Sequence, residues 1–106
     1  MFASCRKGRY NISRKGGLTL KVVAKPVNMI AVFNVNDRPC PFRFRFLDEH
    51  HRTVEVTVEH VFSVEERKTA GTDAFRYECQ SRIRGQERRY VLKYLLKDAR
   101  WELYKI

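Results

Sequence analysis

The chain has 106 residues, of which 43% are hydrophobic and 12% aromatic, and it carries a formal net charge of +10. This length allows one domain with a single modest core, and the apolar content excludes wholesale disorder. No apolar run approaches a membrane span and none follows the N-terminal cations, so neither a transmembrane helix nor a secretion signal is predicted. The three cysteines match no zinc-binding or redox motif, and we expect a cytoplasmic protein.

The positive charge is concentrated at the N-terminus. Residues 1–28 contain seven lysines and arginines and no acidic residue, whereas the rest of the chain is only mildly basic. Because residues 1–17 show no hydrophobic period and include three glycines, we expect a flexible basic arm, followed by a single β domain over residues 18–106. Such an arm can grip phosphate, although a solvated tail is the commoner outcome.

A further hypothesis concerns the same arm. A purine-rich stretch resembling a bacterial ribosome-binding site can encode Lys15-Gly16-Gly17, and candidate start codons follow from Leu18. The genuine start would then lie at or after Leu18, and residues 1–17 would be a translation artefact. Codons 15 to 17 without a GGAGG-like run would remove the basis of this hypothesis.

The first half of the domain predicts strands. Residues 18–23 alternate weakly and predict an edge strand that ends before Pro26, and residues 29–35 predict a strand that is apolar on both sides. Turn-forming residues occupy 36–39. The stretch 42–47 alternates phenylalanine with arginine, which places three phenylalanines on the core face of a strand and two arginines on the other face.

The phenylalanine face predicts the pairing of this strand with the next one. After a polar turn, residues 54–64 alternate, and one face contains Val54, Val56, Val58, His60, Phe62 and Val64. Joining the two apolar faces sets Phe46 opposite Val54. The same register places Arg45 opposite Glu55, so at least one arginine of the alternating strand is expected to face a carboxylate.

The C-terminal half predicts a hairpin and a returning strand. A polar stretch at 65–73 is expected to close as a loop. Two alternating segments follow, 75–83 and 90–96. A second turn at 97–100 leads to a last strand at 101–106.

The turn of this hairpin contains Gly85. A two-residue loop with glycine in first place predicts a type II′ turn. Pairing across that turn sets Tyr77 opposite Tyr94 and Cys79 opposite Leu92.

The last two strands are also apolar on their reverse side, at Val91, Leu95, Tyr104 and Ile106. Strands that are apolar on both sides must be covered on both sides. The chain therefore predicts an all-β antiparallel meander curled into a small barrel or a two-sheet sandwich. A homodimer would cover the reverse side by association instead.

No arrangement of catalytic residues is evident. Cys79 lies on the predicted core face, and no motif surrounds Cys40. Residues 48–51, Asp-Glu-His-His, offer metal ligands together with His60, but neighbouring histidines on an extended chain point apart, so a solvated turn is favoured. His60 itself is expected to be a hydrogen-bonded core or rim residue. We predict no enzymatic activity, no metal and no cofactor.

A nucleic-acid surface has more support. The outward-facing cations of the predicted strands are candidate phosphate contacts, namely Arg43, Arg45, Arg76, Arg82, Arg88, Arg89 and Lys93. Candidate stacking residues are Tyr90, Tyr94, Tyr104 and Trp101, although core packing explains them better. Glutamates interleave with the cations. In the predicted register Arg82 faces Arg89 without a carboxylate between them, so these two are the best candidates.

From Asp37 onward the chain carries a series of motifs, in order Pro41–Phe46, Val54–Val64, Tyr77-Glu78-Cys79, Gly85, Tyr90–Tyr94 and Trp101–Ile106. The series resembles a group of short, uncharacterised bacterial all-β domains. Members of that group occur near or fused to Y-family translesion DNA polymerases, so the resemblance implies a DNA-repair setting. Most of these motifs are core positions, and the resemblance implies no catalytic residue.

The sequence thus predicts a non-catalytic accessory module that binds nucleic acid or a DNA-repair protein, with no membrane role. The alternative is a protein-interaction or homodimerisation module without a nucleic-acid role. Its interface would consist of Val91, Leu95, Tyr104 and Ile106.

Overall fold

The structure, a computed structural model, describes residues 20–35, 37–69 and 72–106. The predicted basic arm and the hypothesis on its translation start lie outside these residues. The strands are β1 (Val22–Pro26), β2 (Asn28–Val32), β3 (Cys40–Leu47), β4 (Thr53–Thr57), β5 (His60–Thr69), β6 (Thr72–Ile83), β7 (Gln86–Leu95) and β8 (Arg100–Lys105). None of the residues in the described ranges forms a helix that could cross a membrane.

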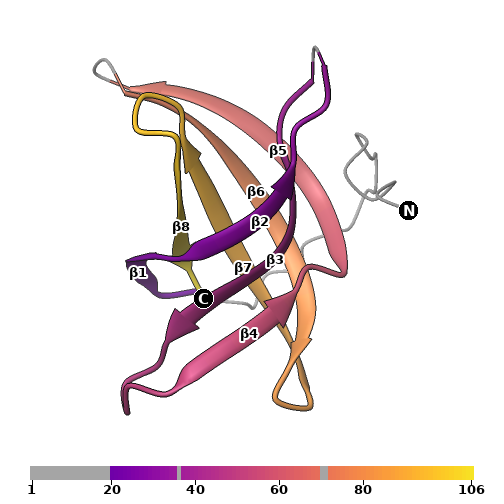
Figure 1. The fold of residues 1–106 in the computed structure, drawn as a ribbon, viewed down its shortest axis with the longest axis vertical. Coiled ribbons are helices and arrows are strands. Elements are labelled where there is room, and N and C mark those ends of the chain that lie inside the picture. The colour runs from indigo at the N-terminus through magenta and orange to yellow at the C-terminus, as the bar shows by residue number, and fades with distance from the viewer. Residues whose placement is uncertain (1–19, 36, 70–71) are drawn as a thin grey trace.

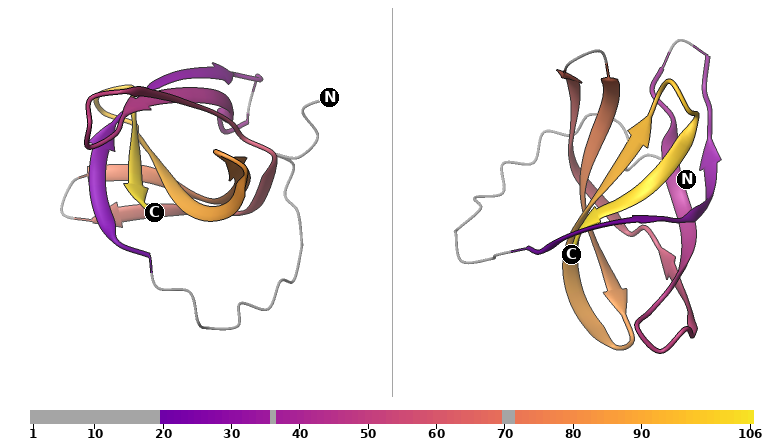
Figure 2. Two further views of the ribbon diagram at one scale, coloured as in Figure 1. Left: turned by 90° about the horizontal axis from the view of Figure 1, so that it is seen from below. Right: turned by 90° about the vertical axis from the view of Figure 1, so that its left-hand side faces the viewer.

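The strands form two antiparallel sheets. One contains five strands in the order β1-β8-β7-β6-β5, and the other contains three in the order β2-β3-β4. Their strands cross at a steep angle (Figure 1). This confirms the all-β antiparallel fold in its two-sheet form. The segments 22–32 and 53–69 each pass from one sheet into the other, which joins the sheets at their corners (Figure 2).

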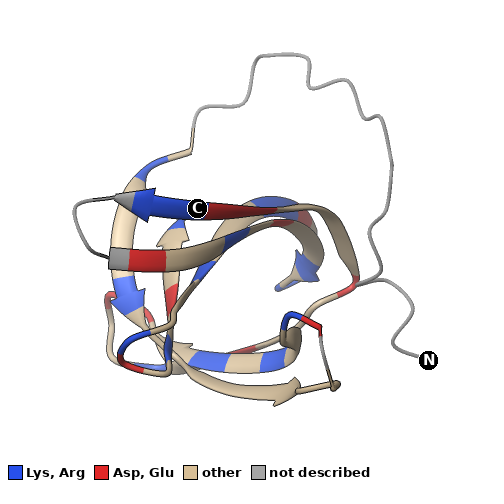
Figure 3. Cartoon of the chain, turned by 90° about the horizontal axis from the view of Figure 1, so that it is seen from above, with Lys and Arg blue, Asp and Glu red and all other residues tan. Residues whose placement is uncertain are grey.

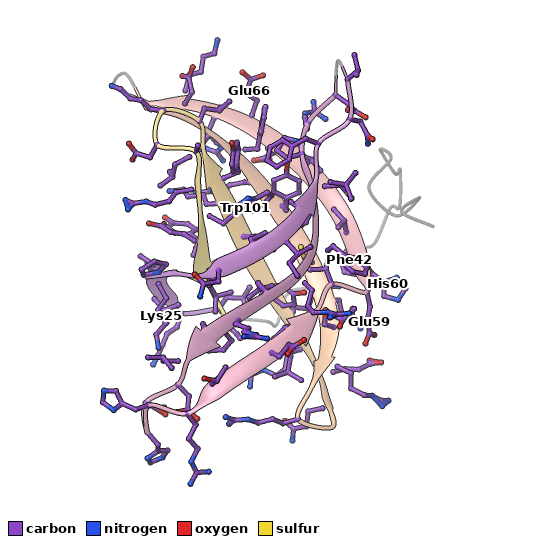
Figure 4. All side chains as sticks on the ribbon, viewed as in Figure 1. Lys25, Phe42, Glu59, His60, Glu66 and Trp101 are labelled. Atoms are coloured by element: carbon purple, nitrogen blue, oxygen red, sulfur yellow. The ribbon has the colours of Figure 1, made fainter. Side chains whose placement is uncertain are left out.

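The core lies between the two sheets. Its largest fully buried side chains are Tyr77, Tyr90, Phe44, Leu92 and Leu103. Trp101 points into the same interior (Figure 4), where its ring centroid lies 5.3 Å from that of Tyr77 and 4.8 Å from that of Tyr94. Aromatic side chains of both sheets therefore meet in the core.

The buried tyrosines have hydrogen-bond partners. Tyr77 donates its hydroxyl proton to the carbonyl oxygen of Pro39, and the hydroxyl groups of Tyr90 and Ser81 are hydrogen-bonded at 2.6 Å. Burial raises the pKa of both tyrosines well above its usual value. Both side chains are therefore neutral core residues with their polar atoms satisfied.

The alternating strand β3 pairs with β4 as predicted. Phe46 lies opposite Val54, and Arg45 lies opposite Glu55. Phe44 is buried and Phe46 packs against the core, but Phe42 is half-buried and lies outside the core cluster of the described residues. Phe42 is the extra residue in a bulge of β3 against β2, so the prediction of three core phenylalanines is correct for two of them.

The strand predicted at 54–64 is in fact two strands in different sheets. β4 ends at Thr57, and β5 begins at His60 after a corner. The change of sheet shifts the alternation by one residue, so Val61 is buried and His60 is exposed at the edge of the molecule (Figure 4). β5 continues to Thr69 through the stretch predicted as a loop, because its many charged residues belong to an exposed edge strand.

The hairpin of β6 and β7 forms in a register displaced by two residues from the predicted one. Tyr77 lies opposite Leu92 rather than Tyr94. The turn consists of Arg84 and Gly85, whose φ angles of 52° and 79° are both positive, so it is type I′ and not type II′. A displacement of two residues leaves the same side chains on the core face but changes every cross-strand neighbour.

Candidate nucleic-acid interface

One side of the five-stranded sheet faces away from the core, and we call it the outer face. From β5 to β8 the residues on this face are His60, Phe62, Ser63, Glu65, Arg67, Ala74, Arg76, Glu78, Gln80, Arg82, Glu87, Arg89, Val91, Lys93, Leu95, Arg100, Glu102, Tyr104 and Lys105. Basic and acidic positions interleave along these strands (Figure 3). The face is therefore mixed in charge, and its local groupings matter more than its total charge.

Tyr104 is the centre of the strongest grouping. Its ring centroid lies 4.0 Å from Nζ of Lys93, 4.9 Å from Cζ of Arg76 and 5.5 Å from Nζ of Lys105. All three cations are within the range in which an aromatic ring attracts a positive charge. They come from three neighbouring strands, so the grouping exists only in the folded sheet.

A β-bulge places Tyr104 in this position. The residues on either side of it pair with consecutive residues of β7, so Tyr104 is the extra residue of β8. As a result Tyr104 and Lys105 both reach the outer face, and Ile106 turns back to pack against the core. Lys105 was not among the predicted site residues, because unbroken alternation would have placed it on the core side.

Two of the cations around Tyr104 lie opposite carboxylates in the sheet, but among the described residues none of the three is held in an ion pair. None of the ion pairs formed among the described residues includes Arg76, Lys93 or Lys105. Glu65 lies opposite Arg76 and Glu102 lies opposite Lys93 in the sheet. Arg76 and Lys93 also lie directly opposite each other, so two like charges are adjacent on neighbouring strands.

A second grouping lies at the β5 side of the outer face. Cζ of Arg89 is 4.6 Å from the ring centroid of Phe62. The ring of His60 is nearly parallel to that of Phe62, at a centroid distance of 6.2 Å. Arg89 and Lys93 lie on the same face of β7, four residues and roughly 14 Å apart, so the two groupings belong to one surface.

The predicted pairing of Arg82 with Arg89 is wrong. Arg82 lies opposite Glu87, and Arg89 lies opposite Gln80. The turn at Arg84-Gly85, one residue earlier than the predicted loop, causes this change of neighbours. The two arginines therefore do not form the unbalanced pair of cations on which their selection rested.

The arginines of β3 belong to the other sheet and are paired with a carboxylate. Arg43 Nη1 lies 3.5 Å from Glu55 Oε2, and Arg45 Nε lies 3.6 Å from Glu55 Oε1. One carboxylate thus serves both arginines. The expectation that at least one of them faces Glu55 is confirmed.

The four candidate stacking residues separate into two classes. Tyr90, Tyr94 and Trp101 are buried in the core. Tyr104 is half-buried and lies on the outer face. Core packing therefore accounts for three of the four rings.

The residues of the alternative interface do not form one apolar surface. Val91 is buried, Leu95 is half-buried, and Ile106 packs against the core. Tyr104 is surrounded by the three cations. Among the described residues the exposed large apolar side chains lie elsewhere, at Val22, Ile30, Phe33, Val35, Leu47 and Leu96.

The predicted polar turn after β3 is organised by Asp48. Its Oδ1 accepts hydrogen bonds from the backbone N–H groups of His50 and Arg52, at 2.8 and 2.9 Å. Its Oδ2 lies 2.7 Å from Nη2 of Arg84 in the hairpin turn. The Arg52 backbone hydrogen bond, followed by the Arg84 hydrogen bond, holds the pKa of Asp48 well below its usual range.

The candidate metal ligands and the thiol of Cys79 form no reactive site among the described residues. Within the described ranges no three His, Cys, Asp or Glu residues lie close enough to hold a metal ion. Cys79 is buried as predicted, and burial raises the pKa of its thiol, so the group is protonated and packs as a small apolar side chain.

Comparisons with protein families, with curated proteins and with solved structures found no match to this chain.

Proposed function

We propose that the chain is a non-catalytic accessory module that binds nucleic acid through the outer face of its five-stranded sheet. The observation that carries the proposal is the convergence of Arg76, Lys93 and Lys105 on the ring of Tyr104. Lysines and arginines bind phosphates and release the counterions condensed on them, and an adjacent ring offers a contact for a base. The resemblance to domains found near Y-family polymerases supports a DNA-repair setting.

The arrangement of charges also favours a polyanionic ligand. Arg76 and Lys93 are directly opposed on neighbouring strands, and like charges in that position destabilise a sheet. A bound phosphate would turn this repulsion into attraction for both side chains. Local costs of this kind are typical of functional sites.

The test is a triple substitution, R76Q/K93Q/K105Q, with labelled single-stranded and duplex oligonucleotides titrated at several salt concentrations. We expect affinity to fall at least about tenfold. The slope of log K against log salt should become shallower by about 2, since each phosphate contact contributes about 0.7 to 0.9 to its magnitude. Stability should change by less than about 1 kcal/mol, because the lost cation–aromatic attraction is offset by relief of repulsion.

The matched control is R43Q/R45Q/R52Q, which removes the same charge from the β3–β4 region. Because Glu55 already pairs with two of these arginines, this variant should bind nearly as well as the unmodified chain. An equal loss in both triple variants would show that total charge alone matters, and it would contradict the proposal.

The N-terminal arm needs a separate variant. A full-chain variant with five glutamine substitutions tests the contribution of the arm to binding. It replaces Arg6, Lys7, Arg9, Arg14 and Lys15. Binding that disappears in this variant, and that is unchanged by R76Q/K93Q/K105Q, would assign the affinity to the arm.

The alternative, a homodimerisation module with no nucleic-acid role, has its own outcome. Sedimentation equilibrium would show a dimer that dissociates when Tyr104 is replaced, and neither oligonucleotide would bind. The apolar surface predicted for this alternative is not continuous, which is why we favour the nucleic-acid proposal.

A further inference from the structure

We infer that the outer face binds single-stranded rather than duplex nucleic acid, with unpaired bases stacking on Tyr104 and Phe62. This inference rests on the proposed function and names the substrate of the same surface. Both rings lie on the outer face with cations beside them.

The positions of the two rings favour a ligand with unpaired bases. Each cationic grouping is centred on an aromatic side chain, one from β8 and one from β5. Bases inside a duplex already stack on each other, so a protein ring can stack only on a base that is unpaired. In a surface made for duplex phosphates these rings would add nothing, whereas in a surface for single strands they supply sequence-tolerant affinity.

The distribution of carboxylates on the outer face favours a flexible strand over a stiff duplex. Glu78 and Glu102 lie on the outer face among the cations, and they would repel a continuous row of phosphates. A duplex is stiff over roughly 150 base pairs and cannot steer its phosphates around such positions. A flexible single strand can place its phosphates at the cations and its bases on the rings.

The spacing of the two groupings allows one short strand to reach both. Arg89 and Lys93 lie on one face of β7, roughly 14 Å apart. This places both rings within reach of a short oligonucleotide, because comparable single-strand surfaces have site sizes of about 4 to 16 nucleotides. Occupation of both rings by one strand is therefore geometrically feasible.

The experiment measures the binding of the full chain to three probes, each twelve nucleotides long. They are oligo-dT, a duplex, and an abasic strand that keeps the phosphates but lacks bases. Fluorescence anisotropy at one fixed salt concentration gives the affinities. We expect oligo-dT to bind at least about tenfold more tightly than either other probe. Y104L should weaken oligo-dT binding by about 5- to 100-fold, whereas Y104F should retain most of it, because only the second variant keeps the ring.

Two further variants make the result specific. F62L removes the second ring and should also weaken oligo-dT binding without changing duplex binding. F33A is the matched control, since Phe33 is an exposed aromatic residue away from the outer face, with an edge-to-face contact to Tyr94, and it should bind like the unmodified chain. Circular dichroism and thermal unfolding establish that each variant is folded.

The outcomes separate the two proposals. Duplex or abasic strand binding as tight as that of oligo-dT, or a folded Y104L and F62L that bind oligo-dT normally, would overturn the single-strand inference and leave the proposed function intact. Absence of binding to all three probes would overturn both.

Discussion

Two surfaces of this molecule contain the same kinds of residue and differ in what surrounds the cations. On β3, Arg43 and Arg45 alternate with phenylalanines, and Glu55 pairs with both arginines at 3.5 and 3.6 Å. On the outer face of the five-stranded sheet, cations from β6, β7 and β8 converge on Tyr104 instead. The arginines of the first surface are held in ion pairs within the fold, whereas the cations of the second form no ion pair among the described residues and remain available to a ligand.

The difference does not lie in the presence of an aromatic ring. Arg43 also lies over a ring, with its Cζ 5.3 Å from the centroid of Phe42. Ion pairing with a cross-strand carboxylate distinguishes the two surfaces. Glu55 lies within ion-pair distance of both β3 arginines. Glu65 and Glu102 lie opposite Arg76 and Lys93 but are not in ion pairs with them. Alternation of aromatic and basic residues in a sequence is therefore a sign of a strand before it is a sign of a binding surface.

The largest expected effect is on the free energy of unfolding, when a phenylalanine of β3 is replaced. Phe44 is 1% exposed and belongs to the core cluster, so F44A should lower the free energy of unfolding by about 3 to 5 kcal/mol. F42A, on the same strand but outside that cluster of described residues, should cost less than about half as much. Urea unfolding measures both. Equal costs would contradict the bulge at Phe42, and a tenfold loss of oligonucleotide affinity in folded F42A would contradict the separation of roles.

The next effect concerns the ion pair that joins the two regions. Asp48 follows β3, and Arg84 lies in the turn between β6 and β7. Because the folded-state pKa of Asp48 is held below its ordinary value of 3.8, the carboxylate contributes stability that is fully present above that value and is lost as the pH falls below it. Thermal unfolding of the unmodified chain and of D48N, between about pH 6 and pH 2, should therefore converge at the acid end.

A partial variant sharpens this result. R84Q removes the side-chain partner but leaves the backbone hydrogen bonds from His50 and Arg52. It should keep part of the acid dependence, since the Arg52 hydrogen bond is the largest cause of the lowered pKa. An unchanged acid dependence in D48N would show that another carboxylate is responsible.

The sequence predicted which side chains of β6 and β7 face the core, but it did not predict their neighbours. The reason is the turn. Arg84 adopts a positive φ that asparagine or glycine usually marks, so nothing in the sequence distinguished the type I′ turn from the predicted type II′ turn. The choice of Arg82 and Arg89 depended on those neighbours and failed with them, whereas the pairing of Arg45 with Glu55 was correct because buried phenylalanines fixed it.

Bulges and a change of sheet explain the other differences. Each shifts the alternation by one residue, and no residue type marks the place in advance. His60 was predicted on an apolar face and is exposed, and Ile106 was predicted on the reverse side and packs against the core. The bulge at Tyr104 also creates the grouping with Lys105, so the most distinctive part of the candidate site was the least predictable from alternation.

The smallest expected effect tests the comparison most directly, through the carboxylate of Glu55. E55Q leaves Arg43 and Arg45 in place and removes the negative charge that pairs with them, so oligonucleotide affinity should rise by about two- to fivefold. The loss of exposed ion pairs should change stability by less than about 1 kcal/mol. E49Q is the matched control, because it makes the same change of net charge at an exposed turn position. If both variants raise affinity equally, only net charge matters and the two surfaces do not differ in kind. If E55Q alone raises affinity, the ion pairs with Glu55 are what keep the arginines of β3 from binding the oligonucleotide, and the cations around Tyr104, which form no ion pair among the described residues, remain available to it.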